Sequence, residues 1–95
     1  MNSSTVNGTF FFDPDDKIYQ DHFPGNPIVP GSLIIHAFMK ACNIEDYVNF
    51  QIHSFGFKKF VSPGEYEYKV EKKENKYFCN LLKQNEIYAT GIFMK

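Results

Sequence analysis

The second half of the chain alternates between apolar and charged residues. Tyr66, Tyr68 and Val70 point to one side of an extended chain, and the charged residues between them point to the other. A period of two is typical of an antiparallel strand with one buried face. Turn residues divide this half further, so that the expected strand segments are 50–52, 55–57, 66–71, 77–82 and 87–94. The pattern predicts a meander of three or four antiparallel strands.

A single helix is predicted for residues 32–44, which contain neither Gly nor Pro, with Ser32 or Gly31 as its N-cap. Apolar residues occupy nearly every angular position, so this helix should be buried on most sides. The polar exceptions follow a helical spacing of i, i+4, i+7 and i+11, and form one stripe that faces a groove, a partner subunit or solvent: His36, Lys40, Asn43 and Tyr47.

The chain before the helix combines one strand with a stiff loop. The aromatic run 9–12 is prone to form a strand and is stopped by the turn sequence Asp-Pro-Asp-Asp at 13–16. Pro24, Pro27 and Pro30 then stiffen the loop 22–31. The element order predicts an α+β fold for residues 1–95 as a single domain, with one buried central helix wrapped by an antiparallel sheet.

Composition narrows the classes of partner. Lys and Arg number 10 against 11 Asp and Glu, which leaves a net charge of −1 and argues against the dense basic surface typical of nucleic-acid binding. All ten basic residues are Lys, so an anionic ligand must be held by Lys, His or backbone N–H groups. A chain this short buries only about two thirds of its surface on folding, which favours a dimer.

The cysteines and the lengths of the apolar runs bear on the cellular compartment of the protein. Cys42 and Cys79 have no zinc-binding spacing, and a disulfide framework would need a secretory context that the N-terminal residues do not supply. No apolar run approaches the ~20 residues needed to span a bilayer. We therefore expect a cytoplasmic protein with no metal and no membrane insertion.

His22 is the first candidate for chemistry. It precedes the stiff loop, which runs into the N-terminus of the predicted helix. This arrangement places a general base beside a site that can stabilise a developing oxyanion.

Residues 22–35, HFPGNPIVPGSLII, resemble the signature of the hotdog-fold 3-hydroxyacyl-[acyl-carrier-protein] dehydratases of fatty-acid synthesis. Residues 57–65, FKKFVSPGE, are similar to the later FxxPVxPGD turn of that family, and residues 10–20 resemble its first strand and approach loop. The resemblance implies a single hotdog domain, paired as a homodimer with two active sites at the interface.

The resemblance also implies the substrate and the roles of individual residues. The substrate is a thioester on the phosphopantetheine of acyl carrier protein, lodged in an apolar tunnel, and no cofactor takes part. His22 matches the base that removes the proton next to the thioester carbonyl, and the N–H of Gly31 matches the group that polarises that carbonyl. A helix carboxylate from across the interface protonates the departing hydroxyl. The expected substrate contacts are Phe23, Pro30, Lys40 and Phe57.

The carboxylate position is where this sequence departs from the family. Fourteen residues after the motif His, the dehydratases place Glu or Asp, and here the residue is His36. Four residues further on, Lys40 replaces the usual Gln. Glu45 falls on the opposite face of the helix and Asp46 lies roughly 15 Å along its axis, so neither reaches the site.

Two interpretations of His36 stay open. It acts as a weak or indirect acid, handicapped because an apolar setting and the charge of Lys40 favour its neutral form. Otherwise His36 and Lys40 only line an interface or bind an anionic group such as the pantetheine phosphate.

The favoured function is therefore loss of water from a 3-hydroxyacyl thioester on acyl carrier protein, in fatty-acid, polyketide or aryl-polyene synthesis. One alternative is a thioesterase on the same fold, with His22 or His36 activating water. The other is a catalytically silent acyl-binding subunit that pairs with a second hotdog chain carrying the missing carboxylate.

Overall fold

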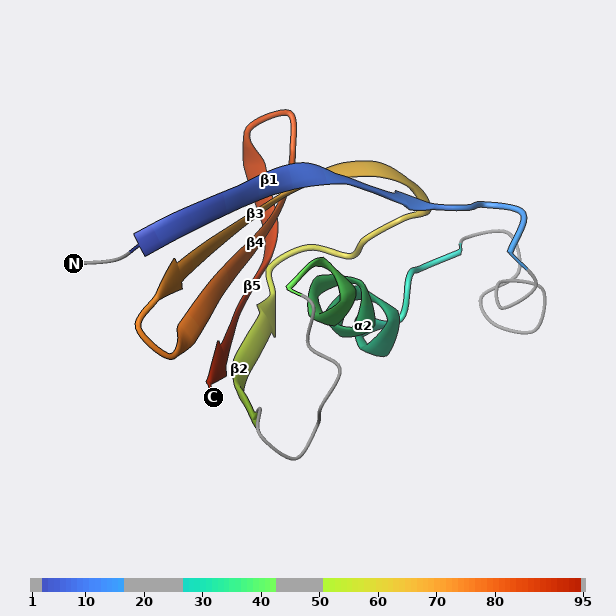
Figure 1. The fold of residues 1–95 in the computed structure, drawn as a ribbon. Coiled ribbons are helices and arrows are strands. Elements are labelled where there is room, and N and C mark those ends of the chain that lie inside the picture. Colours follow the sequence, from blue (N-terminus) through green and yellow to red (C-terminus); the bar gives the residue numbers. More distant parts are fainter. Residues whose placement is uncertain (1–2, 17–26, 43–50, 95) are drawn as a thin grey trace.

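The computed structural model describes residues 3–16, 27–42 and 51–94. Five strands and one helix make up this part of the chain (Figure 1). In chain order they are β1 (Ser3–Phe12), α2 (Gly31–Ala41), β2 (Gln51–Phe57), β3 (Gly64–Lys73), β4 (Lys76–Lys83) and β5 (Glu86–Met94). The predicted α+β class is confirmed, and every predicted strand is present.

The strands form one antiparallel sheet in the order β1-β3-β4-β5-β2. The meander is confirmed for β3, β4 and β5, which are joined by tight turns with positive φ at Glu74, Gln84 and Asn85. β2, the first strand after the helix, is not paired with its neighbour in sequence, β3. Instead, β2 pairs with β5 at the end of the strand order opposite to β1, and residues 58–63 connect it to β3.

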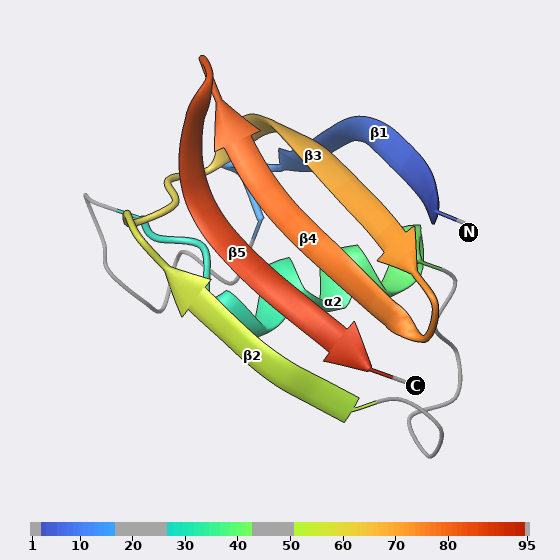
Figure 2. The ribbon, with the colours of Figure 1, turned by 90° about the vertical axis from the view of Figure 1, so that its left-hand side faces the viewer.

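The helix α2 lies against one face of the sheet, and the opposite face carries no helix in the described part of the chain (Figures 1 and 2). Ile34, Phe38 and Met39 are its buried residues. Alternation along β3 is confirmed, since Tyr66 and Val70 are buried and Glu67 is exposed. Helix and sheet together bury the core: Phe12, Val29, Ile34, Phe38, Met39, Val61, Tyr66, Val70, Cys79, Leu81, Ala89 and Phe93.

The start of the helix differs from the prediction. The N-cap is Pro30, and neither Ser32 nor Gly31 takes that position. Pro30 is extended, with φ −61° and ψ 143°, and its carbonyl accepts hydrogen bonds from the N–H groups of Leu33 and Ile34 at 3.0 and 3.3 Å. A backbone carbonyl thus begins the helix without a capping side chain. The C-cap is Cys42, and residues 43–44 of the predicted helix lie outside the described residues.

The polar stripe is confirmed where it can be followed. His36 and Lys40 are exposed, whereas Asn43 and Tyr47 lie outside the described residues. The prediction that the helix is buried on most sides is only partly met, because Leu33, Ile35 and Ala37 are half-buried against the core. None of the described helical residues form a helix long and apolar enough to cross a membrane.

Candidate active site

The segment before the helix is tied to the connection between β2 and β3. The N–H of Val29 donates a hydrogen bond of 2.7 Å to the carbonyl of Val61, and both side chains are buried. The N–H groups of Lys58 and Lys59 in turn donate to the carbonyl of Tyr88 on β5. These bonds hold the start of α2 beside the end of β2.

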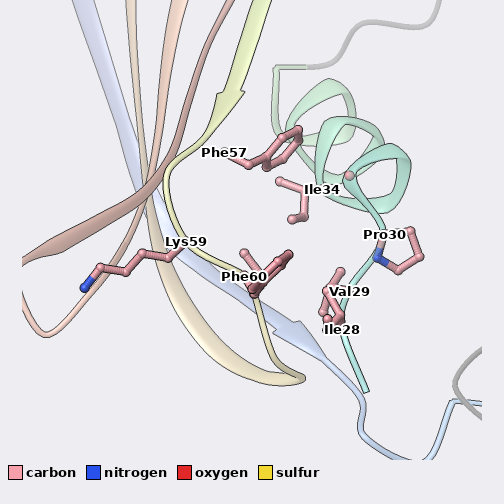
Figure 3. A pocket seen from close by; sticks show the side chains of 9 residues that line it. Ile28, Val29, Pro30, Ile34, Phe57, Lys59 and Phe60 are labelled. Atoms are coloured by element: carbon pink, nitrogen blue, oxygen red, sulfur yellow. The ribbon is translucent and has the colours of Figure 1, made fainter. Parts of the chain in front are cut away.

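A cavity of about 520 Å³ opens between these two segments, at the N-terminal end of α2 (Figure 3). Its walls are almost entirely carbon, which suits an acyl chain better than a polar ligand. Three of the predicted site residues line it, namely Pro30, Gly31 and Phe57. The other lining residues are Ile28, Val29, Ile34, Lys59, Phe60 and Val61.

Gly31 allows an aromatic ring to reach the first turn of the helix. A Cβ atom at this position would lie 2.9 Å from Cζ of Phe57, which is closer than a real Cβ contact. The close approach of Phe57 therefore favours glycine at position 31, because a Cβ atom there would displace the end of the ring. The N–H of Gly31 belongs to the first turn of the helix, and among the described residues it donates to no backbone carbonyl. It remains available, together with the positive end of the helix dipole, for an oxygen in the cavity.

Lys59 is the one lining residue with a titratable side chain, and its ammonium group is engaged elsewhere. Nζ forms an ion pair with the carboxylate of Glu86 and lies 5.4 Å from the centroid of the Tyr88 ring. In Figure 3 the side chain runs away from the other lining residues. Lys59 thus contributes its aliphatic stem to the wall and leaves the cavity uncharged.

His36 and Lys40 do not line the cavity of their own chain. Ile34 faces the cavity, and two residues further along a helix the side chain has turned by about 200°. Both polar residues are exposed instead, so the apolar setting expected for His36 is not found in a single chain. The other two predicted residues, His22 and Phe23, lie outside the described residues.

Several residues that line the cavity carry no signal of that role in the sequence. Ile28, Val29, Ile34 and Val61 are ordinary apolar positions whose role depends on the Val29–Val61 contact. Phe60 does carry a signal in the sequence, because it occupies the position of the first proline in the FxxPVxPGD turn. Its side chain is 82% exposed at the rim of the cavity. An exposed aromatic residue in this place is typical of a surface that meets a ligand or a partner.

No group of three His, Cys, Asp or Glu residues that could bind a metal ion occurs in the described ranges. The described wall of the cavity offers hydrogen bonding by the Gly31 N–H and exclusion of water by its apolar side chains.

Comparison with known proteins identifies the family. Residues 1–92 match the family model described as ApeI-like, ApeI dehydratase. The chain belongs to the ApeI-like dehydratases. The resemblance noted in the motif 22–35 is thereby confirmed, and this ApeI-like chain is a dehydratase-like hydro-lyase with a hotdog fold.

Two curated relatives agree with this assignment. The 3-hydroxyacyl-[acyl-carrier-protein] dehydratase FabZ of Ehrlichia canis is 34% identical, over 93% of this chain and 72% of the relative. The enzyme of the same name from Fusobacterium nucleatum is 32% identical, over 81% of this chain and 56% of the relative. The ApeI-like chain therefore spans about half to three quarters of the length of these relatives.

Two solved structures share the fold. An uncharacterized protein from Erwinia carotovora subsp. atroseptica superposes with a TM-score of 0.72 at 18% identity, covering 97% of this chain and 82% of that one. A chain of the dehydratase heterocomplex ApeI:P from Xenorhabdus doucetiae gives 0.71 at 17% identity, covering 99% and 93%. The hotdog architecture is thus shared at low sequence identity.

Proposed function

We propose that the chain removes water from 3-hydroxyacyl thioesters carried on the phosphopantetheine of acyl carrier protein. The observation that carries the proposal is the apolar cavity of about 520 Å³ at the start of α2, where the N–H of Gly31 has no backbone partner among the described residues. A thioester needs both features, a dry channel for its acyl chain and a donor for its carbonyl oxygen. The names of the FabZ relatives point to the same substrate class.

In this mechanism the Gly31 N–H donates a hydrogen bond to the thioester carbonyl as negative charge develops on its oxygen. The helix dipole adds to that stabilisation, because the oxygen lies at its positive end. Phe57 and Ile34 exclude water from the reacting carbon. His22, by resemblance, removes the proton next to the carbonyl, and the 3-hydroxyl leaves as water once it has been protonated. The reaction consumes no co-reactant.

Among the described residues that line the cavity, none offers a free side-chain acid to protonate the hydroxyl, which favours delivery of the proton by a second chain. Lys59 is committed to Glu86, and His36 and Lys40 face away from their own cavity. We propose a homodimer in which His36 of one chain lies toward the cavity of the other and acts as a weak or indirect acid. Support comes from β2, an edge strand that exposes 53% of Ile52 and 45% of Phe57.

A heterodimer is the second candidate assembly, in which another hotdog chain brings the carboxylate that this chain lacks. The observation in its favour is that neither exposed residue of the α2 stripe, His36 or Lys40, is an acid. A structural neighbour, ApeI:P, is itself a dehydratase heterocomplex. In that assembly this chain holds the acyl group, and its partner completes the reaction.

The test is incubation of the chain with 3-hydroxyacyl and enoyl carrier-protein substrates of several chain lengths, followed by mass spectrometry of the released pantetheine arm. We expect loss of one water from the first substrate and gain of one water by the second. The variant His22→Ala tests the proposed base: it should fold, and its rate of dehydration should fall at least ~10²-fold, which is the usual contribution of a general base.

Other outcomes discriminate between the candidates. Release of the free acid would replace the dehydratase with a thioesterase. Turnover that occurs only after a second hotdog chain is added would establish the heterodimer. A His22→Ala variant that keeps full turnover would show that the base has been assigned wrongly.

A further inference from the structure

Two tyrosines hold the connection 58–63 between β2 and β3 at its two ends. At the first end, the carbonyl of Tyr88 accepts hydrogen bonds of 2.8 and 3.3 Å from the N–H groups of the first two residues of the connection. At the second end, the hydroxyl of Tyr66 donates a hydrogen bond of 2.9 Å to the carbonyl of Ser62. The rings of Tyr66 and Tyr88 contact each other edge to face, with their centroids 5.3 Å apart. The two attachments are therefore joined to each other.

The side chain of Tyr66 is fixed by its surroundings and is only 2% exposed. Its ring packs edge to face against Phe12 of β1, and Nζ of Lys83 lies 4.8 Å from the ring centroid. Gly64 has a φ of 143°, which suits glycine, and it lets the chain turn back so that the Ser62 carbonyl meets the hydroxyl. A buried hydroxyl needs such a partner, and here the partner is backbone beside the cavity wall.

The carbonyl of Ser62 is one residue away from the contact that places the start of α2. Val61 lines the cavity, and its carbonyl accepts the hydrogen bond from the N–H of Val29. Pro30, whose φ is fixed by its ring, joins Val29 to Gly31. In Figure 3 the connection and the segment before the helix form opposite walls of the cavity. A shift of the Ser62 carbonyl therefore reaches the Gly31 N–H through a short, stiff stretch of backbone and one hydrogen bond.

We propose that Tyr66 is a positioning residue for the dehydration, and that its hydroxyl, through the Ser62 carbonyl, sets the position of the Gly31 N–H. The inference rests on the proposed function and adds to it a residue that does not itself line the cavity. A hydrogen bond to the thioester oxygen strengthens as negative charge develops in the transition state. Misplacing its donor therefore lowers kcat more than it weakens substrate binding.

Tyr66→Phe removes the hydroxyl and keeps the buried ring. For a 3-hydroxyacyl carrier-protein substrate, we expect kcat to fall about tenfold, or ~1.4 kcal/mol of transition-state stabilisation, with KM within about twofold of the wild-type value. The amide hydrogen of Val29, followed by NMR, should exchange with solvent about tenfold faster or more, because its acceptor is no longer held in place.

Tyr68→Phe serves as the control. It removes a hydroxyl from the same strand and the same face, where the ring stacks on Phe10 of β1 at a centroid distance of 4.2 Å. This variant should change neither kcat nor the exchange of the Val29 amide.

The outcomes separate the inference from the proposed function. In a chain that turns over, the inference requires both the lower kcat and the faster Val29 exchange, and either change alone overturns it. A rise in KM at unchanged kcat would show that Tyr66 only shapes the wall, and a Tyr66→Phe chain that no longer folds would assign the hydroxyl to stability. A wild type without turnover would refute the proposed function, and the Val29 exchange would then decide whether Tyr66 fixes the start of α2.

Discussion

At the scale of single residues, Gly31 does two things that no other residue could do at once. Its missing side chain lets the ring of Phe57 pack against the first turn of α2, and its N–H donates to no backbone carbonyl in the described part of the chain, so that it can meet an oxygen in the cavity. Glycine normally costs a helix up to about 1 kcal/mol relative to alanine, so its presence here has to be explained by packing. The contact with Phe57 supplies that explanation.

The variant Gly31→Ala tests this explanation. The new Cβ, 2.9 Å from Cζ of Phe57, must push the ring aside, and it narrows the cavity beside the N–H. We expect kcat/KM for a 3-hydroxyacyl carrier-protein substrate to fall about 10- to 100-fold, or ~1.4–2.7 kcal/mol of transition-state stabilisation. The melting temperature should change little, because better helix propensity offsets the displaced ring.

Ser32→Ala is the matched control, since Ser32 is the next residue of the same turn and is exposed. It should leave both kcat/KM and stability unchanged. If Gly31→Ala retains wild-type turnover, the close approach of Phe57 has no catalytic importance.

At the scale of secondary-structure elements, α2 presents different chemistry on its different faces. Ile34 faces the cavity and Phe38 is buried in the core, while His36 and Lys40 are exposed on the polar stripe. The stripe replaces the acid and amide of the family pattern with two bases, one turn apart. If the proposed roles of His22 and Gly31 hold, the acid step is where this element should limit the rate.

His36→Glu restores a carboxylate at the family position, and we expect dehydration to rise about tenfold. Lys40, one turn away, should hold that carboxylate in its ionised form and so reduce its use as a donor. The double variant His36→Glu, Lys40→Gln should therefore exceed the single one, with a non-additive gain. Single-turnover kinetics measure the elimination step directly.

A wild type that already dehydrates faster than both variants would reverse this conclusion. His36 would then be an adapted catalytic group, and the interpretation of it as a handicap would be wrong.

At the scale of the whole molecule, the sheet has two edges of different character. The order β1-β3-β4-β5-β2 leaves β1 and β2 without a neighbour on one side. Both edge strands expose aliphatic residues, Val6 on β1 and Ile52 on β2. Only β2 is also continuous with the cavity, through Phe57. This continuity favours β2 as the edge that meets a second chain.

Light scattering should give a mass of twice 11.1 kDa for the wild type. Ile52→Lys should produce a monomer, because a charge on an exposed edge opposes strand pairing. Val6→Lys places the same charge on the other edge and should leave the dimer intact. Dissociation by Val6→Lys alone would move the interface to β1, and a stable wild-type monomer would remove the shared active site from the proposal.

Local pattern was enough to predict the elements of this fold. The strands follow from alternation at Tyr66, Tyr68 and Val70, and the helix follows from an apolar run without Gly or Pro, because both depend on residues that are neighbours in the chain. The resemblance of residues 22–35 to the dehydratase signature could also be seen in the sequence, because the signature is a run of neighbouring residues. The N-cap of the helix was predicted wrongly because Pro30 caps it with its backbone carbonyl, a group that every residue has.

Contacts between distant residues could be learned only from the folded chain. The pairing of β2 with β5, the bond from Val29 to Val61 and the ring of Phe57 over Gly31 each join segments that are far apart in sequence. The cavity exists only where those segments meet. Packing at close density selects such pairs by shape, and no periodicity along the chain encodes them.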